Sequence, residues 1–129
     1  MFRKFLHSRA SSFRHAFAGW GHVFHTQPNA WIHAGFTVAV ILAGIWLELS
    51  YQKWAILLLT ITLVWTAELI NTAIEAVVDL ACQEHHQLAK IGKDTAAGAV
   101  LASAAGSILI GILILGPPLW DKLRALFTR

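Results

Sequence analysis

Charge is scarce in this sequence: Asp, Glu, Lys and Arg together make up 13% of its 129 residues. Soluble globular domains carry about 25% charged residues, so this scarcity argues against an ordinary soluble domain. Hydrophobic residues make up 57% of the chain and gather into long runs. We therefore predict one small all-α integral membrane domain over residues 1–129.

Several motifs are also missing. One cysteine, Cys82, is too few for an internal disulfide or a cysteine-rich metal site. The phosphate-binding pattern G-x-x-x-x-G-K-[ST] is absent, which excludes a P-loop enzyme of that form. The basic start lacks the apolar h-region of a secretory signal. The ten Lys and Arg residues are spread along the chain and form no patch, so we expect no nucleic-acid partner.

The N-terminal part predicts an amphipathic helix over about residues 2–26. Phe, Leu, Trp and Val recur there at three- and four-residue steps, with Arg, His and Ser between them. Such a segment favours a position along the membrane interface over one across the membrane. Pro28 suits the first turn of a new helix and makes a helical Gln27 unfavourable, so a break is expected there.

Three apolar segments follow, each long enough to cross a bilayer. They cover about residues 30–49, 54–80 and 92–115. The second is about 40 Å long as a helix, which exceeds a hydrocarbon layer of ~30 Å, so its acidic C-terminal half should emerge at one surface. The third is rich in Ala, Gly and Ser, which favours close helix packing and oligomerisation. We expect Gly116-Pro117-Pro118 to end it, leaving a basic tail over residues 119–129.

The distribution of Lys and Arg predicts the orientation. With three spans, the N-terminus and the polar connection at residues 80–94 share one side, which holds six of these residues against four on the other. The positive-inside tendency places the N-terminus and this connection in the cytoplasm.

The stretch ELINTAIEAVVD, from Glu68 to Asp79, continues a run of 14 residues without a charge, WAILLLTITLVWTA. At about 100° per residue, Asn71, Glu75 and Asp79 lie at about −60°, −20° and +20° from Glu68. Carboxylates within a membrane are costly unless they are paired, hydrated or metal-bound, so this stripe predicts a functional site. Asn71 could instead serve only to pack helices together.

A second polar cluster follows the stripe. It contains Glu84, His85, His86, Lys90, Lys93 and Asp94. Carboxylates and a cation near a membrane surface suit a nucleotide with Mg²⁺, because oxygen ligands hold this metal and Lys neutralises phosphate. One carboxylate of the stripe could take the proton of an attacking hydroxyl. Asp79 could alternatively do no more than pair with one of the lysines.

The blocks AELINTAIEAVVDL and HHQLAKIGKDTAAGAV together resemble the small prokaryotic diacylglycerol kinase family, which includes undecaprenol kinases. SFRHAFAGWGHVF is similar to the surface helix of that family, so the resemblance covers nearly the whole chain. It implies a homotrimer in the bacterial inner membrane that moves the γ-phosphoryl of ATP to a membrane lipid hydroxyl with Mg²⁺. The lipid would be undecaprenol or diacylglycerol, and the N-x-x-I-H stretch from Asn29 to His33 slightly favours undecaprenol.

The resemblance also implies roles for individual residues. Glu68 would be the general base, Asn71 would support the site, and Glu75 would bind Mg²⁺. The nucleotide would be held by His15, Glu75, Glu84, His86, Lys93 and Asp94. Gln27 stands where the family usually has a second metal-binding glutamate; its amide oxygen can bind Mg²⁺ but brings no charge.

Two alternatives stay open. The acidic stripe could line an ion or proton path in a small oligomeric membrane protein, because carboxylates inside spans also mark such paths. The chain could also be a catalytically impaired kinase, in which Gln27 allows nucleotide binding but only slow turnover.

Overall fold

The computed structural model describes residues 2–127, with side chains described for Arg9 and residues 11–127. Met1 and the last two residues of the expected basic tail lie outside this range. The described chain folds into four helices and contains no strand. Three of the helices are long and apolar enough to cross a membrane, which confirms the prediction of an all-α membrane protein.

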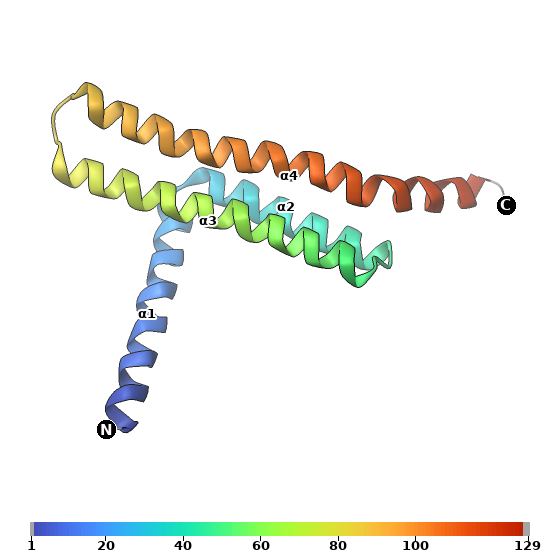
Figure 1. Cartoon of the computed structure of the whole chain (residues 1–129), viewed down its shortest axis with the longest axis horizontal. Coiled ribbons are helices and arrows are strands. Elements are labelled where there is room, and N and C mark those ends of the chain that lie inside the picture. The colour runs from blue at the N-terminus through green and yellow to red at the C-terminus, as the bar shows by residue number, and fades with distance from the viewer. Residues whose placement is uncertain (1, 128–129) are drawn as a thin grey trace.

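The first two helices meet at a sharp bend. Helix α1 covers Phe2–Thr26 and α2 covers Pro28–Trp46, and α1 runs across the direction of the other helices (Figure 1). Gln27 has extended backbone angles (φ −110°, ψ 107°) and Pro28 opens α2. The residue before a proline avoids the helical region, so this pair ends one helix and starts the next. The bend leaves α1 where an interfacial helix would lie if α2 crossed the membrane.

The other two helices form a long antiparallel pair. Helix α3 covers Tyr51–Ala81 and α4 covers Gln87–Phe127, and α2 lies beside the N-terminal part of α3 (Figure 1). At 1.5 Å per residue, α3 is about 46 Å long and α4 about 61 Å, so both outreach a hydrocarbon layer of about 30 Å. On the side of the α1–α2 bend that faces away from α2, the C-terminal part of α3 and the N-terminal part of α4 continue side by side (Figure 1).

Two expectations about α4 are wrong. The polar connection is only residues 82–86, shorter than the expected 80–94, because α4 already begins at Gln87. Gly116-Pro117-Pro118 does not end the helix, because α4 continues to Phe127. Two prolines remove two backbone donors, but proline's fixed φ is itself helical, and helices in membranes tolerate such interruptions.

A small aromatic core anchors α1. Val23, Ala30 and Trp65 are buried together at the place where α1, α2 and α3 meet. The rings of Trp20 and Phe24 pack against Trp65 with centroid distances of 4.9 and 5.5 Å. This core fixes the angle between the surface helix and the spanning helices.

The opposite end of the helical layer is closed by the α2–α3 turn. Glu48 adopts φ 53° in this turn. Lys122 of α4 reaches it, donates a hydrogen bond to the carbonyl oxygen of Trp46, and lies 3.7 Å from Oε1 of Glu48. A Cβ atom on Gly44 would come within 2.8 Å of the Trp54 ring, so a residue without a side chain is needed there. We call these contacts the distal clamp.

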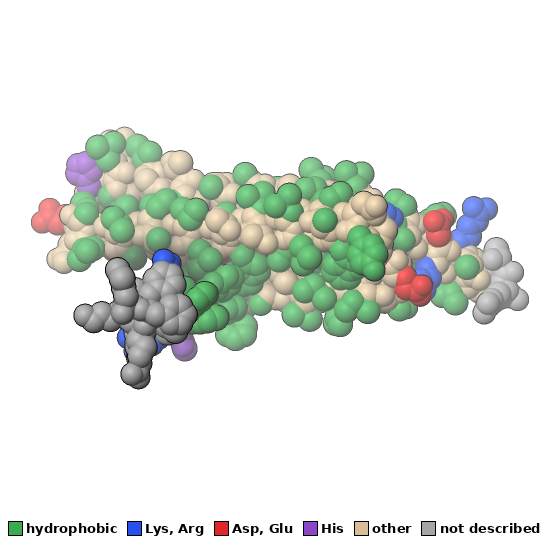
Figure 2. All heavy atoms as spheres, turned by 60° about the horizontal axis from the view of Figure 1, so that its bottom comes forward, with side chains coloured by type: hydrophobic (Ala, Val, Ile, Leu, Met, Phe, Trp, Pro, Cys, Tyr) green, Lys and Arg blue, Asp and Glu red, His purple; other side chains and the backbone are tan. Residues whose placement is uncertain are grey.

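The surface matches a membrane environment. Hydrophobic side chains cover the middle of the layer, whereas acidic and basic side chains gather towards its two ends (Figure 2). Large exposed side chains such as Leu59, Leu63 and Ile70 lie along α3. Exposing this hydrophobic surface to water would be unfavourable, whereas contact with the hydrocarbon chains of lipids carries no such free-energy penalty.

Candidate active site

The polar stripe of α3 faces inward from Glu68 to Glu75, whereas its last residue, Asp79, is exposed. Glu68, Asn71 and Thr72 are buried, with exposed fractions of 1%, 6% and 5%, and Glu75 is partly buried. The spacing of three, four and seven residues puts all four on one face of the helix. The hydroxyl of Thr72 donates to the carbonyl oxygen of Glu68 at 2.9 Å, so it is satisfied within the helix. The carboxylates are therefore the reactive groups of this face.

Glu75 is held by two amides. Nε2 of Gln27 donates to its Oε2 at 2.7 Å, and Nδ2 of Asn71 donates to its Oε1 at 3.2 Å. The extended Gln27 that separates α1 from α2 is thus brought beside α3. Oδ1 of Asn71 is buried and has no hydrogen-bond partner. If either amide rotated by half a turn, its oxygen would replace its N–H group on the side of the Glu75 carboxylate. Carboxylate and amide oxygens are the kinds of ligand that Mg²⁺ prefers.

Glu68 is the least satisfied group of the site. Both of its carboxylate oxygens are buried without a hydrogen-bond partner. The nearest partner is His33 of α2, whose Nε2 lies 3.8 Å from Oε2 and is likewise without a hydrogen bond. A buried carboxylate without partners is costly, so this position is suited to a ligand that brings a hydrogen-bond donor.

His33 was not among the site residues expected from the sequence. It appeared there only within the N-x-x-I-H stretch, although it is the single imidazole in an uncharged span and lies one helical turn after Asn29. The spacing of one helical turn between Asn29 and His33 was the signal in the sequence that could have identified His33 as a site residue. Its contact with Glu68 depends on how α2 packs on α3, which no local pattern specifies.

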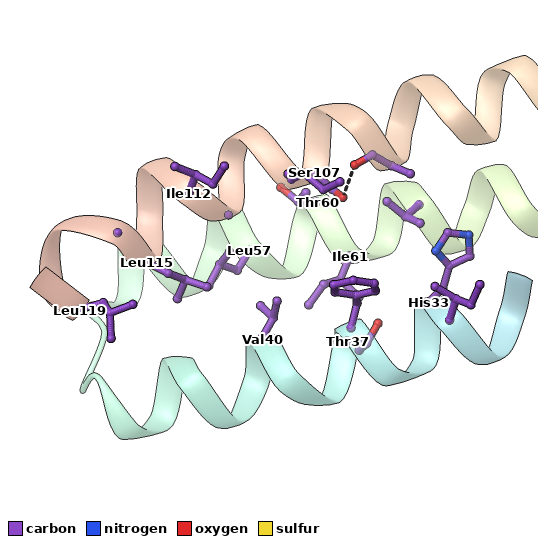
Figure 3. A pocket seen from close by; sticks show the side chains of 17 residues that line it. His33, Thr37, Val40, Leu57, Thr60, Ile61, Ser107, Ile112, Leu115 and Leu119 are labelled. Carbon is purple, nitrogen blue, oxygen red and sulfur yellow. Dashed lines mark hydrogen bonds between the residues drawn. The ribbon is translucent and has the colours of Figure 1, made fainter.

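Two hollows meet at His33. A polar hollow of about 240 Å³ is lined by Gln27, His33, Glu68, Asn71 and Glu75, among others. A larger groove of about 580 Å³ runs between α2, α3 and α4 towards the distal clamp, with His33 near one end and Leu119 near the other (Figure 3). His33 lines both hollows. A molecule with a polar head and an apolar chain could therefore occupy both.

The groove has almost no hydrogen-bonding capacity of its own. Its three hydroxyl residues are Thr37, Thr60 and Ser107. Thr60 and Ser107 each donate to a backbone carbonyl at 2.7 Å, and Thr37 accepts a bond from Nε1 of Trp65 at 3.2 Å. Apart from His33, the remaining lining is aliphatic, aromatic or glycine, so the groove suits a hydrocarbon chain.

Apart from Glu75, the expected nucleotide residues do not line the polar hollow. Glu84 and His86 are exposed in the α3–α4 connection, where Nδ1 of His86 accepts a bond from the backbone of Leu88 at 3.2 Å. Lys93 pairs with Oδ1 of Asp79 at 2.7 Å, one of the alternatives that the sequence left open. Asp94 follows on the exposed side of α4.

His15 is also remote from the stripe in sequence and in place. It lies exposed on α1, with its Nε2 3.3 Å from the hydroxyl of Ser11. The chain by itself thus brings together Gln27, Glu68, Asn71 and Glu75. It does not bring the remaining predicted nucleotide residues into the same hollow.

The metal-binding capacity of the site is limited. Among the described residues, no group of three His, Cys, Asp or Glu side chains is placed to hold a metal ion. Magnesium sites often use one or two carboxylates together with substrate phosphates. Glu75, together with the amide groups of Gln27 and Asn71, fits a magnesium site of this kind, in which the protein supplies few ligands.

The fold and the site define a helical membrane protein with buried carboxylates at the head of an apolar groove. A family model described as prokaryotic diacylglycerol kinase matches residues 14–115. The chain therefore belongs to the prokaryotic diacylglycerol kinase family, which confirms the resemblance seen in its motifs. The matched range includes the stripe, the α3–α4 connection and Lys93.

Three relatives illustrate the family. A diacylglycerol kinase of Synechocystis is 50% identical over 109 residues, which are 84% of this chain and 62% of that protein. An undecaprenol kinase of Bacillus subtilis is 45% identical over 108 residues, 84% of this chain and 88% of that protein. A diacylglycerol kinase of Escherichia coli is 36% identical over 93 residues, 67% of this chain and 76% of that protein. The match thus spans less than two thirds of the Synechocystis protein. Two of these relatives are named as kinases of diacylglycerol and one as a kinase of undecaprenol.

Proposed function

We propose that this protein transfers the γ-phosphoryl group of ATP to the hydroxyl group of a membrane lipid. The observation that carries the proposal is the position of Glu68, a buried carboxylate without hydrogen-bond partners, beside the junction of a polar hollow and an apolar groove. A lipid hydroxyl at that junction supplies the missing donor, and its hydrocarbon chain fills the groove. The names of the relatives point to the same chemistry.

In this reaction Glu68 acts as the general base. It accepts the proton of the lipid hydroxyl as the oxygen attacks the γ-phosphorus, and the bond from that phosphorus to the oxygen bridging the β- and γ-phosphates breaks to release ADP. Burial helps, because a carboxylate shielded from water interacts strongly with a single donor. Asn71 supports the site from one turn further along α3.

Glu75 would hold Mg²⁺. The amide oxygens of Gln27 and Asn71 would join its carboxylate as ligands once each amide, which now donates an N–H to Glu75, had turned. When bound, Mg²⁺ supplies positive charge that offsets the charge of the phosphates. Phosphoryl transfer relies mainly on such positioning and charge neutralisation, so a compact cluster of this kind is adequate.

ATP approaches from the side of the α3–α4 connection. Lys93 offers a cation for the phosphates, and its present partner Asp79 is exposed and easily exchanged for water. Glu84, His86 and Asp94 lie at the same end of the molecule, whereas His15 lies on α1, away from the hollow. The resemblance to the family assigns these residues to the nucleotide.

The groove favours undecaprenol over diacylglycerol as the lipid. Diacylglycerol carries two ester carbonyl groups that accept hydrogen bonds, whereas undecaprenol carries none. The hydroxyls of Thr60 and Ser107 already donate to the backbone, so the groove has few donors for ester carbonyls: the hydroxyl of Thr37 and the imidazole of His33, both near its site end. A single apolar chain leaves no polar group unsatisfied there.

The same proposal includes a homotrimer in the bacterial inner membrane, with the N-terminus and the α3–α4 connection in the cytoplasm. The exposed aliphatic residues along α3, such as Leu59, Leu63 and Ile70, supply an apolar face that a second copy could cover. The small residues of α4 allow close approach of helices. A neighbouring copy would also enclose the nucleotide residues that a single chain leaves exposed.

The test measures phosphate transfer from labelled ATP with Mg²⁺ in mixed micelles that contain undecaprenol or diacylglycerol. We expect label in undecaprenol, and a loss of about 10²- to 10⁴-fold in Glu68→Gln. The variant should elute at the same size as the unmodified protein, which controls for folding. Equal activity of Glu68→Gln would contradict the role of Glu68 as base.

A second candidate is an impaired kinase. It is favoured by Gln27, which donates its amide hydrogen to Glu75 where a second carboxylate would add charge for Mg²⁺. Label in neither lipid would support this candidate if Gln27→Glu then restored transfer. No gain in Gln27→Glu would count against it.

A further inference from the structure

His33 stands between the base and the lipid groove, and the reaction described above leaves it without a task. Its side chain is 14% exposed, its Nε2 lies 3.8 Å from Oε2 of Glu68, and neither atom has a hydrogen bond. Two buried polar atoms that face each other without a bond are costly. A shift of less than 1 Å would bring them within the range of a charge-assisted hydrogen bond.

The ring of His33 is held in place by its surroundings. It meets the Trp65 ring edge-on, with a centroid distance of 6.2 Å and an interplanar angle of 70°. Trp65 is fixed in turn by its hydrogen bond to Thr37 and by the rings of Trp20 and Phe24 from α1. A continuous packed path therefore runs from the surface helix through Trp65 to His33 and then to Glu68.

Building on the proposed function, we infer that His33 is a positioning residue for the base. With its N–H on Nε2, His33 holds the Glu68 carboxylate in the orientation that faces the lipid hydroxyl. The lipid hydroxyl then approaches the other oxygen of the carboxylate. His33 itself need not touch the reacting atoms.

This role differs from that of a residue that merely fills space. A spacer acts through volume, so leucine would replace it well and glutamine poorly. A hydrogen-bond donor acts through its N–H, so glutamine would replace it and leucine would not. A misplaced catalytic group costs about 10²-fold in rate, which sets the scale of the expected loss.

The experiment compares His33→Leu, His33→Gln and His22→Leu in the micelle assay with undecaprenol. His22 is exposed on α1 and serves as the matched control. We expect His33→Leu to lower kcat about 10²-fold with an unchanged KM for ATP, and His33→Gln to recover most of the rate. His22→Leu should behave as the unmodified protein. Equal losses in the leucine and glutamine variants would overturn the inference.

A double variant shows whether His33 acts through Glu68. If it does, adding His33→Leu to Glu68→Gln lowers the residual rate no further, because the group being positioned is already gone. If the two losses multiply, the inference is wrong and His33 acts independently of Glu68.

The inference can also be separated from the proposed function itself. Thermal unfolding in detergent of the two single variants and the double variant measures the coupling of the pair without any turnover. If the unmodified protein labels no lipid, the proposed function fails, while non-additive Tm changes still support the His33–Glu68 pair. Additive Tm changes overturn the pair. If the unmodified protein is active but His33→Leu is equally active, only the inference on His33 fails.

Discussion

Each end of the helical layer pairs a lysine of α4 with a carboxylate, yet the two ends differ in what surrounds the pair. At the distal clamp, Lys122 also donates to a backbone carbonyl and lies 5.0 Å from the centre of the Trp46 ring. At the other end, Lys93 pairs with Asp79 at 2.7 Å; both carboxylates, Glu48 and Asp79, are exposed. Close to that end, His33, Glu68 and Asn71 have buried atoms without partners.

The distal clamp has a structural role, whereas the other end carries the groups that we expect to bind ligands. At the distal clamp, Lys122 is satisfied by the chain's own atoms, as expected where its only task is to hold helices together. The site end leaves groups unsatisfied, and a fold tolerates that cost where a ligand supplies the missing partners. The following changes test this contrast by altering matched residues at the two ends.

The largest contrast is expected between Glu75→Gln and Glu48→Gln. Glu75→Gln removes the carboxylate that two amides surround, so phosphoryl transfer should fall by more than the roughly 10–100-fold typical of groups that only support a metal ligand. A titration with Mg²⁺ at fixed ATP should show a weaker apparent affinity. Glu48→Gln should leave both values unchanged, and a comparable loss in the two variants would break the comparison.

A smaller contrast is expected between Lys93→Met and Lys122→Met. A hydrogen bond between charged groups contributes about 1.5–3 kcal/mol, so Lys93→Met should raise the KM for ATP by roughly 10–100-fold. Lys122→Met should leave this KM unchanged and lower only the thermal midpoint. The measurement is initial rate against ATP concentration for both proteins. An equal KM in both would show that Lys93 does not meet the nucleotide.

The smallest effect on catalysis is expected from Gly44→Ala. The added methyl group would lie 2.8 Å from the Trp54 ring, and overpacking of this kind costs about 1–3 kcal/mol. Thermal unfolding in detergent should show a lower midpoint, while kcat of the folded protein stays the same. A change in kcat without a change in midpoint would mean that the distal clamp controls the site.

Much of the architecture follows from local patterns. The apolar runs predicted the three long helices, and the sequence around Pro28 predicted the break between α1 and α2. The patterns failed where a local signal competes with membrane packing: Pro117 and Pro118 marked a helix end, yet α4 passes through them. Polar residues also suggested a long connection, although α4 starts at Gln87 and places Lys93 on a helix.

By itself, the sequence determined the helical membrane class and the inward stripe of Glu68, Asn71 and Glu75, because the period of a helix is a local property. Only the tertiary structure decided what meets that stripe. Gln27 reaches Glu75 across 48 positions of the chain, and His33 reaches Glu68 from another helix. Such contacts depend on how whole helices cross and pack, and the periodicity of one helix carries no information about the angle or register of its neighbour.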